Sequence, residues 1–235
     1  MKYYPVCLDI SEKPCVVVGG GEVAARKVER LLECGAAVTV VSRLVNPLLA
    51  ELAAAGRIRH VADNYTEGCL KEAFLVIGAT DREEVNDRIA AACRDRGILV
   101  NIVDDPGRCD FILPALLTRG SLSIAVATDG KSPALARKLR EEMEERFGPE
   151  YAEYLELLGR LRERIIAAGR PAGENRDVFT ALVNSPLYEH LRAGRREEAQ
   201  ALIRDLTGLE VEPNFMPGLE VKLTPAPGEE GKTSS

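Results

Sequence analysis

The sequence predicts an α/β fold in which an N-terminal doubly wound half with a parallel sheet precedes a β-hairpin and a helical region. Short apolar segments alternate with helix-forming segments as far as about residue 105. That order is typical of parallel strands joined by crossover helices. Beyond residue 110 the alternation stops, because a tight turn at 119–121 joins two β-rich segments and helical sequence follows.

The first strand is expected at Val16–Val18, where it leads into Gly19-x-Gly21-x-x-Ala24 and a helix over 22–34. In a dinucleotide-binding unit the first glycine allows a tight turn and the second lets the backbone approach a pyrophosphate, while the third small residue permits close helix–strand packing. The N–H groups and the positive dipole end of the helix hold the phosphates. The alternative is a glycine turn that serves packing alone. The motif therefore predicts a Rossmann-like site whose cofactor-binding residues include Gly19, Gly21, Glu22 and Val23.

Further strands and helices complete this half. Gly35 is placed to end the first helix, and the uninterrupted apolar run FLVIGA is typical of a strand buried on both faces. The expected elements are strand Ala37–Val41, helix Pro47–Ala55, strand Ile58–Val61, strand Phe74–Ala79, helix Glu83–Arg96 and strand Ile98–Val103.

The second half changes character. Strands at Phe111–Leu117 and Leu122–Thr128 flank Arg119-Gly120-Ser121 and predict a hairpin. A helix is expected over 133–147. Tyr151, Tyr154, Leu158, Leu161 and Ile165 form an apolar stripe on the next helix, and short helices are expected near 175–183, 186–193 and 195–207. The predicted organisation is 1–110 for the Rossmann domain, 111–148 for hairpin plus helix, 149–208 for a helical domain, and 209–235 for a tail disordered from about 222.

Composition narrows the classes of function. A net charge of −6 argues against nucleic acid and anionic membrane as general partners. Six cysteines are scattered without a C-x-x-C pair and the two histidines are far apart, so free thiols are favoured and no metal site is predicted. The chain lacks an apolar run of about 20 residues and a signal-peptide pattern. We therefore expect a cytoplasmic protein.

Ligands of doubly wound sheets bind beyond the carboxyl ends of the strands. Besides the glycine loop, three segments are expected to meet there. Arg43 occupies a region where NAD sites often carry an acidic residue and where arginine can bind the 2′-phosphate of NADP, so the residues leave the choice open and favour NADP slightly. The predicted cofactor-binding residues after these strands are Ser42, Arg43, Leu44, Thr80 and Asn101.

Asp104 and Asp105 follow the fifth strand directly and are the best acid–base candidates. Adjacent side chains normally point in different directions, so we expect only one of them to act. A carboxylate at this edge could serve as general base to a ligand lying across it. The alternative is a D-D-P turn in which an aspartate caps backbone N–H groups.

Cations near the hairpin could attract an anionic substrate. Lys131 precedes the helix that starts at 133, Arg137 lies in its first half, and Arg119 lies in the hairpin turn. The alternative is a solvated helix face, which is favoured from the residues alone because Arg137 has Glu141 four positions later.

Four segments in order resemble the siroheme-synthase precorrin-2 dehydrogenase family, which includes a module of bacterial siroheme synthase and a stand-alone fungal enzyme. They are VVVGGGEVAARK (16–27), GATDREEVN (78–86), VNIVDDPGRCDFILPALLTRG (100–120) and LSIAVATDGKSPALARKLREEME (122–144). The resemblance covers nearly all of 1–150 and weakens towards 208. It implies NAD-dependent oxidation of precorrin-2 to sirohydrochlorin, Asp104 as the catalytic residue, and a homodimer joined through the hairpin segment.

The resemblance also implies roles for the cations and for iron. Because the tetrapyrrole substrate carries eight carboxylates, Arg119, Lys131 and Arg137 become candidate substrate-binding residues. Many relatives then insert ferrous iron, which is a substrate and not a bound cofactor. Three hypotheses remain at this point: a dehydrogenase that is also a ferrochelatase, a dehydrogenase alone, and a non-enzymatic NAD-sensing module.

Overall fold

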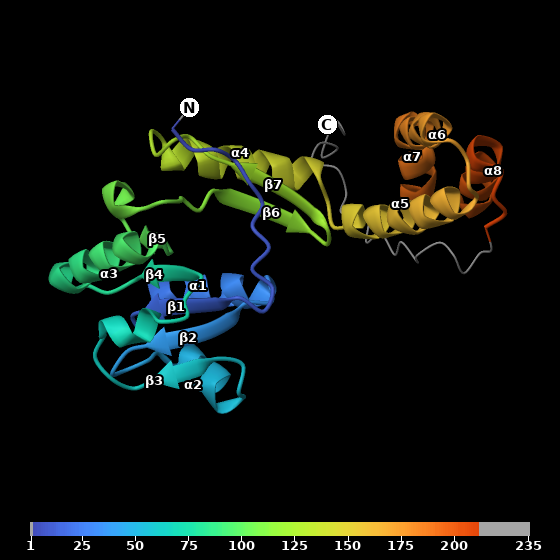
Figure 1. Ribbon diagram of the computed structural model, residues 1–235. Coiled ribbons are helices and arrows are strands. Elements are labelled where there is room, and N and C mark those ends of the chain that lie inside the picture. The colour runs from blue at the N-terminus through green and yellow to red at the C-terminus, as the bar shows by residue number, and fades with distance from the viewer. Residues whose placement is uncertain (1, 212–235) are drawn as a thin grey trace, which may run out of the picture. The chain divides into compact units, whose positions relative to one another are not determined.

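The computed structural model describes residues 2–211. The chain divides into two compact units (Figure 1). The first unit comprises the chain up to residue 113 together with 129–131, and the second comprises 114–128 and the described residues from 132 onward. Each unit has its own secondary structure and its own buried core.

The first unit contains a five-stranded parallel sheet in the order β3-β2-β1-β4-β5. The chain builds β1, β2 and β3 outward in one direction and then returns to place β4 on the other side of β1. The point between β1 and β4 is therefore the topological switch point, where ligands bind in open α/β sheets. Its strands are β1 Pro14–Val18, β2 Ala37–Val41, β3 Arg59–Val61, β4 Leu75–Gly78 and β5 Leu99–Ile102, and its helices are α1 Glu22–Glu33, α2 Pro47–Ala54, α3 Glu83–Arg96 and the 3-10 turns η1 Glu67–Leu70 and η2 Pro106–Arg108. The predicted parallel sheet is confirmed, with boundaries shifted by a residue or two.

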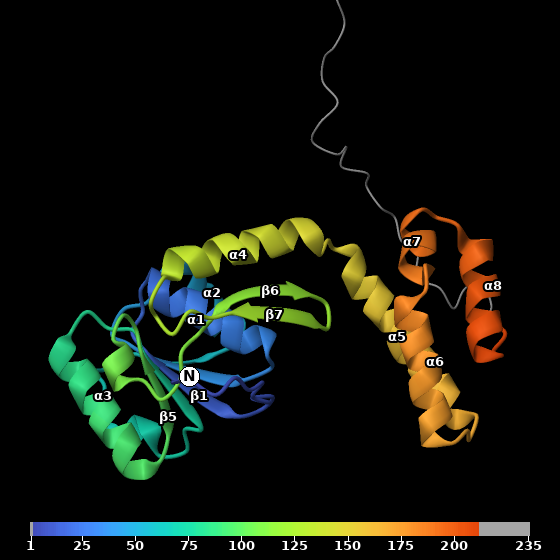
Figure 2. The same ribbon diagram turned by 90° about the horizontal axis from the view of Figure 1, so that it is seen from above.

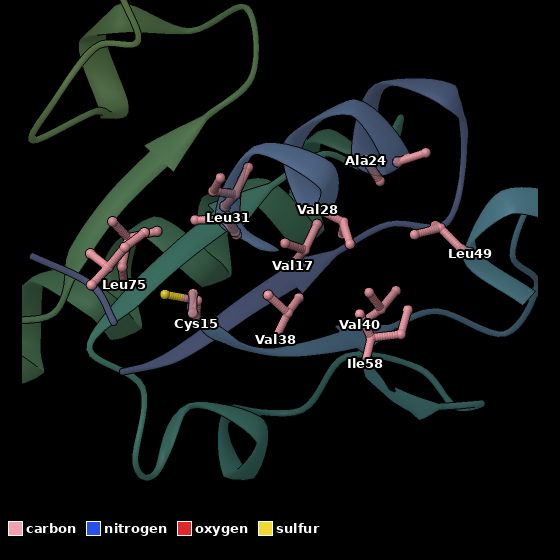
Figure 3. Close-up of a cluster of buried hydrophobic side chains, with 14 residues drawn as sticks. Cys15, Val17, Ala24, Val28, Leu31, Val38, Val40, Leu49, Ile58 and Leu75 are labelled. Carbon is pink, nitrogen blue, oxygen red and sulfur yellow. The ribbon is translucent and has the colours of Figure 1, made fainter. Parts of the chain in front are cut away.

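Both faces of the sheet are covered, which explains why its strands are apolar throughout. Successive side chains of a strand point to opposite faces. Cys15 and Val17 of β1 pack with α1 and α2, whereas Val16 and Val18 pack with α3. Figure 3 shows the first of these clusters, with Ala24, Val28 and Leu31 of α1 over the sheet and Leu49 of α2 beside them.

The turn between β1 and α1 brings three chain segments together. Gly19 has φ +130°, and a Cβ there would overlap the carbonyl oxygen of Ala79 after β4. A Cβ at Gly20 would overlap the carbonyl oxygen of Leu44 after β2. A Cβ at Gly21 would meet nothing within 4 Å. The close packing therefore requires glycine at 19 and 20, and Gly21 leaves open space beside the helix start.

The second unit begins with an antiparallel hairpin of β6 Ala115–Arg119 and β7 Leu122–Val126, as expected around the turn at Gly120-Ser121. The prediction that the first of these strands begins at Phe111 is wrong. The carbonyl of Phe111 accepts a hydrogen bond from the Asn101 amide, and Pro114 has no N–H to offer a ladder. Figure 2 shows α4, Pro133–Arg146, running beside the hairpin.

A helical core makes up the rest of this unit. Its helices are α5 Glu150–Ala167, α6 Ala172–Asn184, α7 Leu187–Arg192 and α8 Arg196–Thr207. From the predicted stripe, Tyr154, Leu161 and Ile165 are buried, and Leu157, which the stripe omitted, is also fully buried. These side chains pack with Leu182, Leu187, Leu191 and Ile203. The predicted disorder from about residue 222 concerns a segment outside the described residues.

Some features bear on binding. All six cysteines are free. Within residues 2–211, no group of three or more His, Cys, Asp or Glu side chains could hold a metal ion. No helix in that range is long and apolar enough to cross a membrane.

Gly19→Ala should lower the free energy of unfolding by about 2–5 kcal/mol, because it combines a positive φ with overlap on Ala79. Gly21→Ala is the matched control and should cost less than about 1 kcal/mol, because φ is −86° and the space is open. Urea unfolding of both variants measures the difference. Equal stabilities would contradict the close approach at Gly19.

Candidate dinucleotide site and catalytic loop

A cleft of about 660 Å³ lies at the carboxyl ends of β1, β2 and β4. The glycine turn forms one wall, and the segments that follow β2, β3 and β4 form the others. Of the residues predicted to bind a cofactor, Gly19, Gly21, Ser42, Arg43, Leu44 and Thr80 line this cleft. It lies wholly within the first unit.

The start of α1 suits a phosphate group. Within the described chain, the backbone N–H groups of Gly20, Gly21, Glu22 and Val23 donate to no protein acceptor, as is usual for the first turn of a helix. Gly21 is the N-cap residue and carries no side chain that could close the site. The open space beside it is therefore available to an anion, which the helix dipole also favours.

The Glu22 side chain has a different role from its backbone. It accepts a hydrogen bond from Asn46 Nδ2 at 3.0 Å. Asn46 also donates its backbone N–H to the Gly20 carbonyl at 2.8 Å and caps α2 by accepting from the Leu49 N–H at 2.9 Å. Asn46 thus fixes the glycine turn against the segment after β2, and Glu22 can reach a phosphate only through its N–H. Val23 is half-buried.

The segment after β2 presents a cation to the cleft. The Ser42 hydroxyl donates to the Leu44 carbonyl at 2.7 Å, and the Ser42 carbonyl lies 2.9 Å from His60 Nε2. Arg43 is exposed and has no ion pair or hydrogen bond within residues 2–211. Leu44 is 84% exposed. This tight turn leaves Arg43 able to contact a ribose or a phosphate.

The segment after β4 is held by the start of α3. Thr80 Oγ1 accepts from the Arg82 N–H, and the Thr80 carbonyl accepts from Asn86 Nδ2, both at 2.9 Å. Asn86 is buried, and its Oδ1 has no hydrogen-bond partner. Thr80 therefore forms a fixed wall of the cleft.

Sequence reasoning missed several lining residues. Tyr65 is buried beside the cleft, its hydroxyl has no partner, and the Arg88 guanidinium lies over its ring. Burial raises the pKa of Tyr65 to about 12, so the phenol is neutral at physiological pH. The loop after β3 could have been predicted as part of the site, because it also follows the carboxyl end of a strand of the parallel sheet. The lining residues that were not predicted include Asn46, Asp63, Asn64, Tyr65 and Arg82.

Asn101 lies away from this cleft. It is buried in β5, and its amide donates to the Phe111 carbonyl at 3.0 Å and to Cys109 Sγ at 3.5 Å. The side chain therefore holds the segment 109–111 against the sheet.

The loop after β5 separates the two adjacent aspartates. Asp105 Oδ1 accepts from the Gly107 N–H at 3.0 Å, and Asp105 Oδ2 pairs with Arg108 Nε at 3.1 Å. Asp105 thus has the turn-capping role that the sequence offered as an alternative. Asp104 is exposed, has φ +62°, and makes no hydrogen bond or ion pair in the described chain. Its carboxylate is therefore available to a ligand.

Lys27 of α1 lies within electrostatic range of this loop. It is half-buried; burial lowers its pKa, neighbouring Arg26 lowers it further, and the charge of Asp104 acts in the opposite direction. Val103, next to Asp104, packs against the cluster that contains α1. The glycine-turn helix and the aspartate loop are thus neighbours at one edge of the sheet.

The three predicted substrate-binding cations have different surroundings. Arg119 donates to the carbonyls of Phe147 at 3.1 Å and Thr118 at 3.0 Å. Arg137 is exposed and pairs with Glu141 at 2.9 Å, which lowers the pKa of that glutamate. Lys131 is exposed and makes no ion pair with a described residue. Lys131 belongs to the first unit, and both arginines belong to the second.

A parallel sheet with a glycine turn after β1, free N–H groups at the start of α1 and a cleft at the switch point define a dinucleotide-binding domain of the Rossmann class. Residues 6–115 match a family model described as NAD(P)-binding. Residues 119–146 match one described as sirohaem biosynthesis protein central.

Proteins similar in sequence point to the same class of protein as these two family models. The siroheme synthase of Methylococcus capsulatus is 40% identical over 204 residues, which cover 86% of this chain and 43% of that protein. The siroheme synthase of Nitrosospira multiformis is 38% identical over 91% of this chain and 46% of its own length. The solved structure of SirC, a precorrin-2 dehydrogenase, superposes with a TM-score of 0.73 at 28% identity and covers 85% of this chain and 98% of that one. Over most of its length the chain is thus similar to siroheme synthases and to a precorrin-2 dehydrogenase, and it spans less than half the length of these curated synthases.

Gly21→Ala should weaken NAD binding about tenfold or more, or about 1.4 kcal/mol, because its methyl group would enter the space beside the free N–H groups. Gly159→Ala, in open space on α5, is the control and should leave affinity unchanged. Calorimetric titration with NAD measures both. An unchanged Kd for Gly21→Ala would mean that the pyrophosphate does not approach this residue.

Proposed function

We propose that this chain oxidises precorrin-2 to sirohydrochlorin with NAD as the oxidant. The observation that carries the proposal is Asp104, an exposed carboxylate without a protein partner at the same sheet edge as the dinucleotide cleft. The siroheme synthase relatives and SirC support this choice of substrate.

The residues at the cleft fit a dinucleotide. The N–H groups of Gly20 to Val23 would hold the pyrophosphate, and the turn Ser42–Leu44 would contact a ribose. The bound nicotinamide supplies a hydride acceptor. Arg43 has no acidic neighbour in ion-pair contact within residues 2–211 and would tolerate the 2′-phosphate of NADP as well.

Asp104 would act as the general base. Oxidation removes two hydrogens from the macrocycle, one as a hydride to the dinucleotide and one as a proton. The Asp104 carboxylate accepts that proton and later releases it to water. Asp105 cannot replace it, because both of its oxygens are engaged by Gly107 and Arg108.

A second activity is proposed on the same residue. Insertion of ferrous iron requires removal of pyrrole N–H protons, which Asp104 could accept. Iron would be a substrate here, so a closed set of protein ligands is not needed. A dehydrogenase without this activity is the alternative, and a non-enzymatic NAD sensor would have no use for Asp104.

The remaining proposals concern partners and location. In the hairpin strands only Leu117 is buried and the other residues are half-buried or exposed, and Leu135 of α4 is 47% exposed, so we propose that a second copy of the chain covers this segment as a homodimer. Arg119, Lys131 and Arg137 are proposed to attract substrate carboxylates. Of these three, Arg137 is paired with Glu141, whereas Arg119 and Lys131 make no ion pair with a described carboxylate. Free, buried thiols at Cys15 and Cys93 suit a cytoplasmic location.

Asp104→Asn should reduce precorrin-2 oxidation by about 10²–10⁴-fold, the usual contribution of a general base. Asparagine tolerates the positive φ of this position, so thermal stability and NAD affinity should stay at wild-type values. An anaerobic spectroscopic assay with precorrin-2 and NAD measures the rate. Full activity of this variant would refute the assigned role, and no oxidation by wild type with NAD or NADP would refute the enzymatic proposal.

With sirohydrochlorin supplied directly under anaerobic conditions, addition of ferrous iron should give siroheme faster with the wild-type protein than in a protein-free control, and Asp104→Asn should lose that acceleration. The absorbance spectrum follows the conversion. Oxidation without faster iron insertion would leave the dehydrogenase-only alternative.

A further inference from the structure

A single arginine ties the aspartate loop to a neighbouring helix. Arg108 lies in η2, directly after the Asp104–Asp105 pair, and its side chain is 26% exposed. Its Nη2 lies 3.0 Å from Glu83 Oε1 and 3.2 Å from Asp87 Oδ1, both on α3. Its Nε lies 3.1 Å from Asp105 Oδ2. The rigid fork of the guanidinium thus joins loop and helix in a way that the single ammonium of lysine cannot reproduce.

A second anchor holds the other side of the loop. The Cys109 thiol lies 3.1 Å from the Ile102 N–H, 3.2 Å from the Ile102 carbonyl and 3.1 Å from the Asp105 carbonyl. It therefore links the loop to the end of β5. Asp104 lies between the two anchors in a left-handed conformation, which aspartate adopts more readily than most non-glycine residues.

The same turns of α3 also fix the cofactor cleft. Asn86, between Glu83 and Asp87 on that helix, donates to the Thr80 carbonyl. The start of α3 thereby contacts a wall of the cleft through Asn86 and the aspartate loop through Arg108. Those contacts set the position of the loop relative to the cleft.

We propose that Arg108 is a positioning residue, which holds the Asp104 carboxylate at the sheet edge through its ion pairs with Glu83, Asp87 and Asp105. The proposal rests on the general-base role proposed for Asp104. Loss of the clamp would let the loop move, and displacement of a reacting group by about 1 Å can cost about 10²-fold in rate.

Arg108→Met should lower kcat for precorrin-2 oxidation by about 10–100-fold, while the KM for NAD stays within about twofold because no cleft contact is removed. Arg108→Lys should recover only part of the rate. Arg96→Met is the matched control. It removes an arginine pair with Glu67 at the opposite end of α3 and should leave kcat within about twofold of wild type.

Loop position can be measured without turnover. Alkylation of Cys109, followed by peptide mapping in a mass spectrometer, should be several-fold faster in Arg108→Met than in wild type, whereas that of buried Cys93 should not change. If wild type fails to oxidise precorrin-2, the proposed function is wrong, yet this measurement still reports whether Arg108 holds the loop.

The double variant Glu83→Gln, Asp87→Asn removes the same ion pairs from the helix side and should reproduce both effects, which keeps the test valid if Arg108→Met folds poorly. Faster alkylation with a kcat that falls and an unchanged KM for NAD would support the proposal. Wild-type kcat in Arg108→Met or in the double variant would overturn it, whatever the alkylation rate.

Discussion

The close approach of backbone at Gly19 and Gly20 is the constraint on which the rest of the first unit depends. There the turn after β1 touches the carbonyl of Ala79 after β4 and that of Leu44 after β2. A side chain at either position would push these segments apart. Because they remain in contact, α1 begins at the switch point of the sheet, and its unpaired N–H groups face the cleft.

The position of α1 on the sheet also determines which of its side chains are buried and which remain partly exposed. Ala24, Ala25, Val28 and Leu31 pack on the sheet, as the helical spacing predicts. Lys27 is half-buried at the edge of this stripe, and the negative charge of Asp104 raises its pKa, against the larger lowering by burial. One helix thus joins the dinucleotide cleft to the loop that carries the proposed base.

Much of the fold could be predicted from local pattern, since apolar runs and glycine turns depend on residues close in sequence. Helix Glu83–Arg96 and strand Ala37–Val41 were predicted with their observed ends. Contacts between distant residues could not be predicted in this way. Phe111 leaves its predicted strand because the Asn101 amide binds its carbonyl, and the same bond uses the side chain expected to bind a cofactor.

The site was predicted in the same uneven manner. The pattern Asp104-Asp105-Pro106 indicated that only one carboxylate would be free, but backbone angles and the position of Arg108 decide which one. The close approach expected at Gly21 is to a ligand and so cannot be seen without one. Gly19 and Gly20, in contrast, lie against the backbone carbonyls of Ala79 and Leu44. Tyr65 was missed because its ring reaches the cleft from a loop without a recognisable motif.

A crystal structure of this chain with bound NAD would show whether the dinucleotide binds at the glycine turn. We expect the pyrophosphate within hydrogen-bond distance of the N–H groups of Gly20 to Val23, with the nicotinamide on the side of Asp104 and the adenosine ribose near Arg43. A dinucleotide bound away from the glycine turn, or one with its nicotinamide beside Arg43, would contradict this expectation.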